Sequence, residues 1–175
     1  MKNLTLEKIT TREVLQLQKI GKQTFTETFS DVNTPKNMQL YLEERFSIEK
    51  LTAELMDKNA SFYFAKLDSQ AIGYLKINIG SAQTELKDEK ALEIERIYVL
   101  KEFHGLKVGQ FLFDHAVQIA KKNRMEYIWL GVWEENKKAI NFYKKNGFTA
   151  FDKHQFVLGN EIQTDIMMKF ILNYD

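Results

Sequence analysis

The chain has 175 residues, is 44% hydrophobic and carries a formal net charge of +1, so it is expected to form a single domain over residues 1–175 without a global attraction to nucleic acid or to an anionic membrane. It contains no cysteine, which excludes disulfides, thiolate metal sites and a cysteine nucleophile. Neither a signal-peptide core nor an apolar run near the ~20 residues that span a bilayer is visible, and the expected location is the cytoplasm.

The first third of the chain predicts a short strand and three helices. Leucines alternate with polar residues over 4–6, which is typical of a strand buried on one face. Thr10 with Glu13 forms a capping-box pattern that opens a helix with an apolar stripe, and Thr34, followed by proline, opens a second helix. Ser47 begins a third, shorter helix.

Strands dominate the rest of the chain, with two helices between them. Helical periodicity returns from Val108, and Gly147 closes a later, short helix over 137–146. Aromatic and β-branched runs, with a polar loop at 80–90, predict strands at 61–67, 71–79, 92–99, 127–132, 148–158 and 163–170. This order predicts a mixed α/β sheet flanked by helices.

A glycine-containing turn joins the strand 92–99 to the helix at Val108. The turn, from Phe103 to Gly109, leaves several backbone N–H groups unpaired at the positive end of the helix dipole. Such a site binds phosphate without a basic side chain, which suits the near-neutral net charge. Two glycines before a helix are more often only a tight connection. The turn also lacks the third glycine of a dinucleotide fingerprint and the Gly-Lys-Ser/Thr of a P-loop.

A second motif gives the chain a family resemblance. The pattern Asn-x-x-Ala-x-x-Phe-Tyr-x-x-x-Gly-Phe runs from Asn136 to Phe148 and resembles the C-terminal signature of the GNAT family of N-acetyltransferases. The strand 92–99 and the turn after it resemble the acetyl-CoA motif of the same family. Within this family, the chain is similar to the PaiA type of bacterial spermidine/spermine acetyltransferase at segments 24–29, 37–43, 93–99, 129–134 and 163–165. The resemblance therefore extends over nearly the whole chain.

The resemblance implies the GNAT fold, a mixed and mostly antiparallel central sheet flanked by helices, with acetyl-CoA bound where the central strands splay apart. The main chain of Ile97, Tyr98 and Val99 would pair with the pantetheine arm like an added strand. In the family's loop pattern, Gln/Arg-x-x-Gly-x-Gly, His104 replaces Gln/Arg and Lys107 replaces a glycine, so Lys107 either adds a positive charge or tightens the loop. The expected pyrophosphate site comprises His104, Gly105, Leu106, Lys107, Val108, Gly109 and Gln110.

Two side chains are expected to carry the chemistry. Tyr143 is the candidate acid for the departing thiolate, because a phenol with a pKa of about 10 is protonated at neutral pH; the alternative is a core aromatic of an amphipathic helix. Glu95 is the candidate base, acting through a water on an amine with a pKa of about 10, or else a solvated or ion-paired carboxylate. Strand alternation predicts that Glu93 and Glu95 share one sheet face and that Ile94 and Arg96 share the other.

Further residues are expected to hold the substrates. Asn136 caps the last helix and contacts pantetheine, although the cap alone explains it. A cationic acceptor favours carboxylates, so Glu27 and Asp31 from the N-terminal helices, together with Glu95 and Trp133, form the expected acceptor site. Surface carboxylates more often only keep a protein soluble. The three histidines show no metal-ligand spacing, and no metal is expected.

The sequence thus predicts an acetyl-CoA-dependent N-acetyltransferase that acts directly on a primary amine, with a polyamine such as spermidine or spermine as the leading acceptor. Two alternatives stay open: an enzyme for another amine, such as a peptide N-terminus or lysine, and a non-catalytic regulator that senses acetyl-CoA or polyamines. The expected partners are the small-molecule amine and, as is common in the family, a second copy of the chain. No nucleic-acid or membrane partner is expected.

Overall fold

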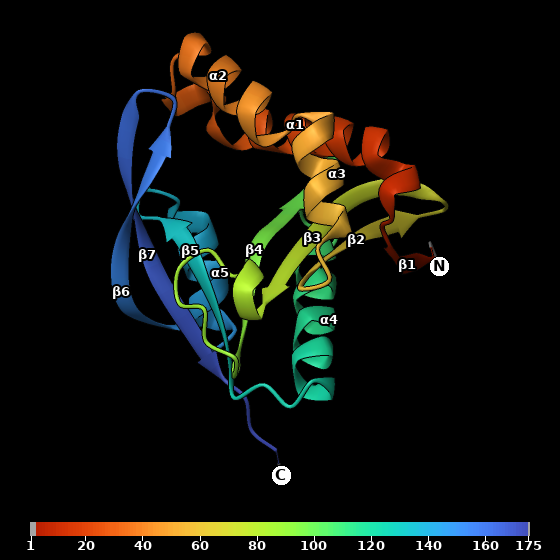
Figure 1. Ribbon diagram of the computed structural model, residues 1–175, viewed down its shortest axis with the longest axis vertical. Helices are drawn as coiled ribbons and strands as arrows, with labels where there is room; N and C mark the ends of the chain where they lie inside the picture. The colour runs from red at the N-terminus through yellow and green to blue at the C-terminus, as the bar shows by residue number, and fades with distance from the viewer. Residues whose placement is uncertain (1–2, 175) are drawn as a thin grey trace.

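A seven-stranded sheet organises the computed structural model, which describes residues 3–174 (Figure 1). Residues 1, 2 and 175 of the expected domain lie outside the described part. The strands, in the spatial order β1-β2-β3-β4-β5-β7-β6, are β1 (Leu4–Lys8), β2 (Ala60–Leu67), β3 (Gln70–Ile79), β4 (Ala91–Val99), β5 (Tyr127–Trp133), β6 (Thr149–Leu158) and β7 (Glu161–Ile171). The α-helices are α1 (Val14–Phe29), α2 (Pro35–Arg45), α3 (Ile48–Met56), α4 (Val108–Lys122) and α5 (Lys137–Lys145). The predicted element order and the mixed α/β sheet are confirmed.

Side-chain caps begin the N-terminal helices where the sequence predicts them. The Thr10 hydroxyl accepts from the N–H of Arg12 at 3.3 Å, and Glu13 Oε2 accepts from the N–H of Thr10 at 2.8 Å. The hydroxyls of Thr34 and Ser47 each accept from the N–H three residues later, at 3.2 Å. These contacts satisfy N–H groups that have no acceptor within a helix. Thr34 and Ser47 cap α2 and α3 directly, whereas Thr10 caps a 3-10 turn, Thr11–Glu13, that continues into α1.

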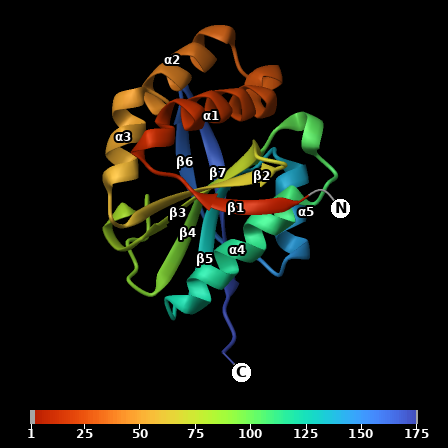
Figure 2. The same cartoon turned by 90° about the vertical axis from the view of Figure 1, so that its right-hand side faces the viewer.

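Helices cover both faces of the sheet (Figures 1 and 2). On one face, Leu112 of α4 shares a fully buried core with Leu75 of β3 and with residues of α5. On the other face, α1, α2 and α3 form a second core in which Phe46 and Phe64 are almost completely buried. The layer of α1–α3 therefore forms a wall over the central strands, opposite α4 and α5.

The strands β4 and β5 form a parallel pair that splays apart. Their pairing covers only Ala91–Glu93 against Tyr127–Trp129, although β4 continues to Val99 and β5 to Trp133. The β3 side of β4 stays paired as far as Val99. The far end of β4 therefore presents backbone N–H and C=O groups to a gap rather than to a neighbouring strand. This gap is the one that the resemblance implies for acetyl-CoA.

A β-bulge in β4 changes which side chains face this gap. Ile94 pairs with Ile77 and Arg96 pairs with Lys76, so Glu95 has no partner of its own on β3. The extra residue shifts the alternation by one position and turns Arg96 to the α1–α3 face, which it shares with Glu93 and Glu95. The prediction that Arg96 shares the opposite face with Ile94 is therefore wrong, because regular alternation stops at the bulge.

Candidate active site

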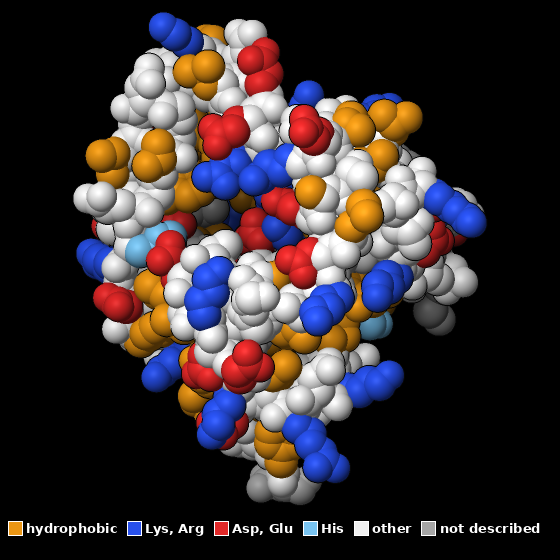
Figure 3. Space-filling model, in the orientation of Figure 1, with side chains coloured by type: hydrophobic (Ala, Val, Ile, Leu, Met, Phe, Trp, Pro, Cys, Tyr) orange, Lys and Arg blue, Asp and Glu red, His pale blue; other side chains and the backbone are white. Residues whose placement is uncertain are grey.

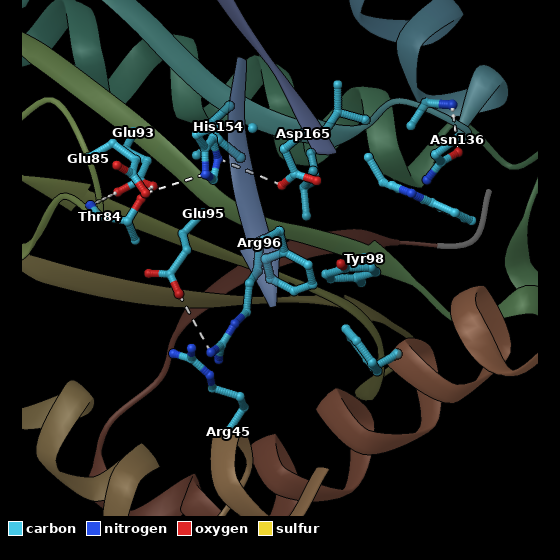
Figure 4. Close-up of a pocket in the computed structure, with 18 of the residues that line it drawn as sticks. Arg45, Thr84, Glu85, Glu93, Glu95, Arg96, Tyr98, Asn136, His154 and Asp165 are labelled. Carbon is cyan, nitrogen blue, oxygen red and sulfur yellow. Dashed lines mark hydrogen bonds and ion pairs between the residues drawn. The ribbon is translucent and has the colours of Figure 1, made fainter. Parts of the chain in front are cut away.

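A cavity of about 380 Å³ lies beneath α1 and α2, beside the gap between β4 and β5. Figure 3 shows a hollow in this face with basic and acidic side chains gathered at its mouth. In Figure 4, side chains from α2, β4, β6, β7 and the segment after β3 point toward the same space. Apart from tyrosines, its ionisable lining residues are Arg45, Glu85, Glu93, Glu95, Arg96, His154 and Asp165.

Glu95 lies in the β4 bulge and is held by three neighbouring side chains. Lys76 Nζ lies 2.5 Å from Glu95 Oε2, and Asn78 Nδ2 donates to the same oxygen at 2.6 Å. Arg96 Nη2 lies 3.5 Å from Glu95 Oε1. Burial opposes ionisation of this carboxyl, but the charges of Arg96 and Lys76 and the hydrogen bonds from Lys76 and Asn78 outweigh it and lower the pKa of Glu95 to about 2. Such a carboxylate is a weak proton acceptor, so the geometry favours the ion-paired alternative over the expected base.

Glu54 of α3 completes a charge-balanced cluster at the base of this cavity. Its Oε2 lies 3.1 Å from Lys76 Nζ and 3.6 Å from Arg96 Nη1. Arg96 also lies over the Phe46 ring, with its guanidinium carbon 4.9 Å from the ring centroid. Two cations and two carboxylates therefore join α3 to β3 and β4, and they hold the bulged strand in place.

Buried polar side chains tie the segment between β3 and β4 to the cavity. Thr84 donates to Glu93 from its N–H at 2.8 Å and from its hydroxyl at 2.5 Å. Trp129 Nε1 donates to Gln83, which is fully buried, at 2.7 Å. Burial raises the pKa of Glu93, and hydrogen bonds from Thr84 and Asn78 oppose that rise. The sequence predicts only a polar loop here, because nothing in its pattern marks Gln83 as a buried residue.

Asp165 of β7 and His154 of β6 form a further titratable pair at the cavity. They are register partners, and His154 Nε2 lies 3.8 Å from Asp165 Oδ2. Burial raises the pKa of Asp165 to about 6, although the charge of His154 opposes this rise. Gly131 of β5 makes room for the pair, since a Cβ there would lie 2.9 Å from His154 Nε2. The sequence predicted both strands, and the resemblance covers 163–165, but neither residue was assigned a role.

The position of Tyr143 is compatible with both interpretations that the sequence left open. It lines the cavity from α5, and it also packs in the core with ring centroids 5.4 Å from Phe142 and 5.5 Å from Phe148. Burial raises the pKa of its phenol, so the hydroxyl stays protonated across the neutral range. A protonated phenol beside the β4–β5 gap has the protonation state that a donor to a leaving thiolate needs.

The main-chain segment expected to hold pantetheine borders the same gap. Ile97 and Tyr98 line the cavity, whereas the Val99 carbonyl already accepts from His104 Nε2 at 2.9 Å. Asn136 also lines the cavity, and its Oδ1 accepts from the N–H of Ala139 at 3.1 Å. The predicted cap of α5 is therefore confirmed, while its contact with pantetheine stays a prediction.

The expected pyrophosphate loop has the backbone of a tight turn. Gly105 has φ +87°, and Lys107 has φ 59°, in the left-handed region that favours the glycine usual at this place. The His104 ring donates to Val99, and its Nδ1 accepts from Lys138 at 3.3 Å, so a second basic residue joins the loop. Leu106 is exposed, and the N–H groups of Val108, Gly109 and Gln110 begin α4 without helical acceptors. The Gln110 side chain is engaged elsewhere, since it donates to Asp114 and Asn146, each at 2.8 Å.

The N-terminal carboxylates expected at the acceptor site lie away from the cavity lining. Glu27 accepts from the N–H of Lys101 at 2.8 Å, and Asp31 is exposed after α1. Trp133 does line the cavity, with its ring centroid 6.0 Å from that of Phe29. The acidic lining comes from the expected Glu95 and from Glu93 of β4, from Asp165 of β7 and from Glu85 of the polar loop. Helix position alone does not reveal which exposed carboxylates face the sheet.

Within residues 3–174, no group of three or more His, Cys, Asp and Glu side chains could hold a metal ion. Over the same range, no helix has the length and apolar character required to cross a bilayer.

Comparisons with known proteins agree with this architecture. Residues 20–148 match the family described as the Acetyltransferase (GNAT) family. An uncharacterized N-acetyltransferase of Lactobacillus delbrueckii subsp. lactis is 37% identical over 169 residues, which cover 97% of this chain and 98% of the relative. A spermidine N(1)-acetyltransferase of Thermoplasma acidophilum is 25% identical over 154 residues, 86% of this chain and 91% of the relative. The solved PaiA N-acetyltransferase from Thermoplasma acidophilum, in complex with coenzyme A, has a TM-score of 0.81 and 22% identity, and the match covers 97% of this chain and 99% of that chain.

Proposed function

Because the chain belongs to the GNAT family of acetyltransferases, we propose that it transfers the acetyl group of acetyl-CoA directly to a primary amine of a polyamine such as spermidine or spermine. Its family and its relatives make it an N-acetyltransferase, and acetyl-CoA is its co-substrate. The polyamine acceptor and the roles of individual residues are the proposed part.

The observation that carries this proposal is the acidic lining of the cavity beside the β4–β5 gap. Four carboxylates line the cavity, from Glu85, Glu93, Glu95 and Asp165, against the guanidinium groups of two arginines. The charge of the buried arginine is balanced by Glu95 and Glu54. The remaining carboxylates attract a cationic acceptor, because opposite charges interact more strongly in a partly buried site than in bulk water. The relative named as a spermidine acetyltransferase supports the same acceptor class.

The residues around the gap suit direct transfer. The unpaired edge of β4 at Ile97 and Tyr98 offers main-chain partners to the pantetheine arm, and the first turn of α4 offers N–H groups to the pyrophosphate. Aromatic rings of Phe29 and Trp133 contact the methylene chain and the cationic nitrogens of the acceptor. Tyr143 donates its phenolic proton to the thiolate as the C–S bond breaks. Direct attack by the amine needs no acyl-enzyme, in keeping with a chain that has no cysteine.

The experiment follows the release of CoA thiol from acetyl-CoA with spermidine, spermine and a panel of other amines, including lysine and a peptide N-terminus. We expect turnover on the polyamines, and we expect Tyr143→Phe to lower kcat by ~10² to 10⁴-fold, the usual contribution of general acid catalysis. Binding of acetyl-CoA, measured by calorimetry, is expected to stay close to that of the wild type.

Tyr127→Phe is the matched control. Tyr127 lies at the start of β5, its hydroxyl donates to Asp88 at 2.7 Å, and it lies outside the cavity lining, so the same change of tyrosine to phenylalanine is made away from the site. This variant is expected to keep the wild-type kcat. Turnover only on lysine or on the peptide would replace the polyamine by another acceptor. Tight binding of acetyl-CoA without turnover on any amine would reject the enzyme hypothesis and favour a non-catalytic sensor.

A further inference from the structure

The nitrogen of the acceptor amine loses two protons during acetyl transfer. The CoA sulfur takes up only one proton in the proposed chemistry. A primary amine with a pKa of about 10 enters as an ammonium ion, and the amide product keeps a single hydrogen on nitrogen. One proton leaves before nitrogen can attack the thioester. The N–C bond then forms, and the C–S bond breaks with its electron pair on sulfur. Tyr143 gives its proton to this thiolate, and the second nitrogen proton replaces it on the phenol. The first proton therefore needs a separate acceptor and a route to water.

Neither carboxylate of β4 suits that first proton. Glu95 is held as an anion by Lys76, Arg96 and a hydrogen bond from Asn78, with a pKa of about 2. Glu93 has both oxygens engaged, since Thr84 donates to each of them and Asn78 donates to Oε2 at 3.0 Å. Burial raises the pKa of Glu93, but three of its roughly four acceptor positions already hold hydrogen bonds, which leaves little room for a proton from a substrate.

Asp165 differs from these two carboxylates in its contacts. It lines the cavity, its Oδ1 is buried and has no hydrogen-bond partner among the described residues, and its Oδ2 faces His154 at 3.8 Å. A buried acceptor without a partner is costly unless a ligand, water or proton satisfies it. Gly131 leaves the space for this pair, because a Cβ would lie 2.9 Å from His154 Nε2 and 3.3 Å from Asp165 Oδ2.

The tautomer of neutral His154 follows from its backbone contact. Its Nδ1 lies 3.1 Å from the Gln155 carbonyl oxygen, which can only accept, so Nδ1 carries the hydrogen. The unprotonated Nε2 then faces Asp165 and can take a proton from its carboxyl group. On the other side of the ring, Nδ1 lies 3.4 Å from Glu85 Oε1, and the Glu85 side chain is 44% exposed. The three side chains lead from the cavity to the surface.

We propose that Asp165 accepts the first amine proton and that His154 passes it to Glu85 and so to solvent. This inference rests on the proposed transfer to an amine. The ammonium N–H bond breaks toward Asp165, the resulting carboxylic acid protonates His154 Nε2, and His154 releases its Nδ1 proton toward Glu85. Exchange of the ring protons with solvent then returns the hydrogen to Nδ1 and frees Nε2 for the next turnover. Net release of one proton per acetyl group balances the reaction.

The charged groups around the pair are compatible with a titration near neutrality. Burial raises the pKa of Asp165 to about 6, and the charge of His154 opposes the rise. Beyond the pair and Glu85, the cavity lining supplies Glu93, Glu95 and Arg96 from β4 and Arg45 from α2. An acceptor with this pKa is ionised at pH 7 and still takes a proton readily, as a general base requires.

The test compares two acceptors that differ only in amine basicity. Spermidine is protonated at neutral pH, whereas fluorine beside the reacting amine lowers the amine pKa of a difluorinated spermidine, so that a large fraction of it is neutral and needs no first deprotonation. We expect Asp165→Asn to lower kcat/KM for spermidine by at least ~10²-fold and that for the fluorinated analogue by less than ~10-fold. The acidic limb of the wild-type pH profile, near pH 6, should disappear in this variant. Controls are Asp152→Asn, at an exposed position of β6, and His115→Gln, on α4 outside the lining.

An NMR titration of carboxyl-labelled Asp165 tests the pair without any acceptor. The resonance is expected to titrate near pH 6 and to move to higher pH in His154→Gln, because the cationic ring no longer favours the ionised carboxylate. Equal losses on both acceptors, or a loss of only a few fold on spermidine, would overturn the proton-acceptor role. An Asp165 titration unaffected by His154→Gln would overturn the pair itself. Failure of the wild type to acetylate any amine would instead reject the proposed function, and the titration would still decide whether the pair exists.

Discussion

Replacing Lys76 with methionine tests the ion cluster beneath the cavity. Lys76 is 4% exposed, and its ammonium lies between Glu95 and Glu54 at 2.5 and 3.1 Å. The contacts of ionised Glu95 lower its pKa from 4.5 to about 2, and each pKa unit corresponds to about 1.4 kcal/mol. These contacts therefore stabilise the fold by about 3 kcal/mol at neutral pH. Because Lys76→Met leaves two buried carboxylates with Arg96 as their remaining cation, we expect a loss of about 3 kcal/mol in unfolding free energy.

The loss should depend on pH in a defined direction. The folded state lowers the pKa of Glu95, so the stabilisation is complete above pH 4.5 and disappears as the pH falls toward 2. The difference in unfolding free energy between the wild type and Lys76→Met should therefore shrink over this range. A purely steric effect of methionine would stay constant with pH.

The assay is urea unfolding from pH 7 down to pH 3, followed by the fluorescence of the two tryptophans, Trp129 and Trp133. At neutral pH, about 3 kcal/mol corresponds to a midpoint lowered by ~1 to 2 M urea. Lys66→Met is the matched control, because Lys66 pairs with the exposed Glu7 at 2.7 Å on the neighbouring strand and should cost less than about 1 kcal/mol. The reasoning is refuted if the two lysine variants lose the same stability, or if the difference at Lys76 does not change with pH.

Three further substitutions address the loop, the segment after β3 and the proton-accepting pair. Lys107→Gly should stabilise the fold by up to ~1 kcal/mol, because φ 59° strains a residue with a Cβ, whereas Lys107→Ala should not stabilise it. Thermal unfolding compares the two variants, and equal melting temperatures would argue against strain. Trp129→Phe should lower the unfolding free energy by about 1 to 3 kcal/mol and speed amide hydrogen exchange over residues 80–90, since it removes the buried donor to Gln83. Unchanged exchange would show that this hydrogen bond does not hold the segment. Gly131→Ala should lower kcat/KM for spermidine, since the new Cβ would displace the His154 ring, while the circular dichroism spectrum stays that of the native fold. Full activity would mean that the position of the ring is not required.

Local patterns in the sequence predicted most of the fold because they act over a few residues. The capping box at Thr10 and the cap at Ser47 place helix starts by hydrogen bonds within one turn. Gly147, at φ +90°, ends α5 in a conformation that glycine adopts without strain. The motif from Asn136 to Phe148 and the strand at β4 also located one wall of the site, because each is continuous in the chain.

The tertiary structure decided which side chains meet in the cavity. Arg96 faces the cavity only because a bulge interrupts β4, and a bulge depends on the partner strand rather than on local alternation. Asp165 meets His154 through the register of a hairpin, and it reaches the cavity because β7 lies next to β5 in the sheet. Glu27, predicted as an acceptor ligand, is instead engaged by a backbone N–H. The sequence by itself therefore determined the family, the element order and the position of Tyr143. The protonation chemistry of the cavity depends instead on long-range packing, which determines how deeply each ionisable side chain is buried and which charged groups lie beside it.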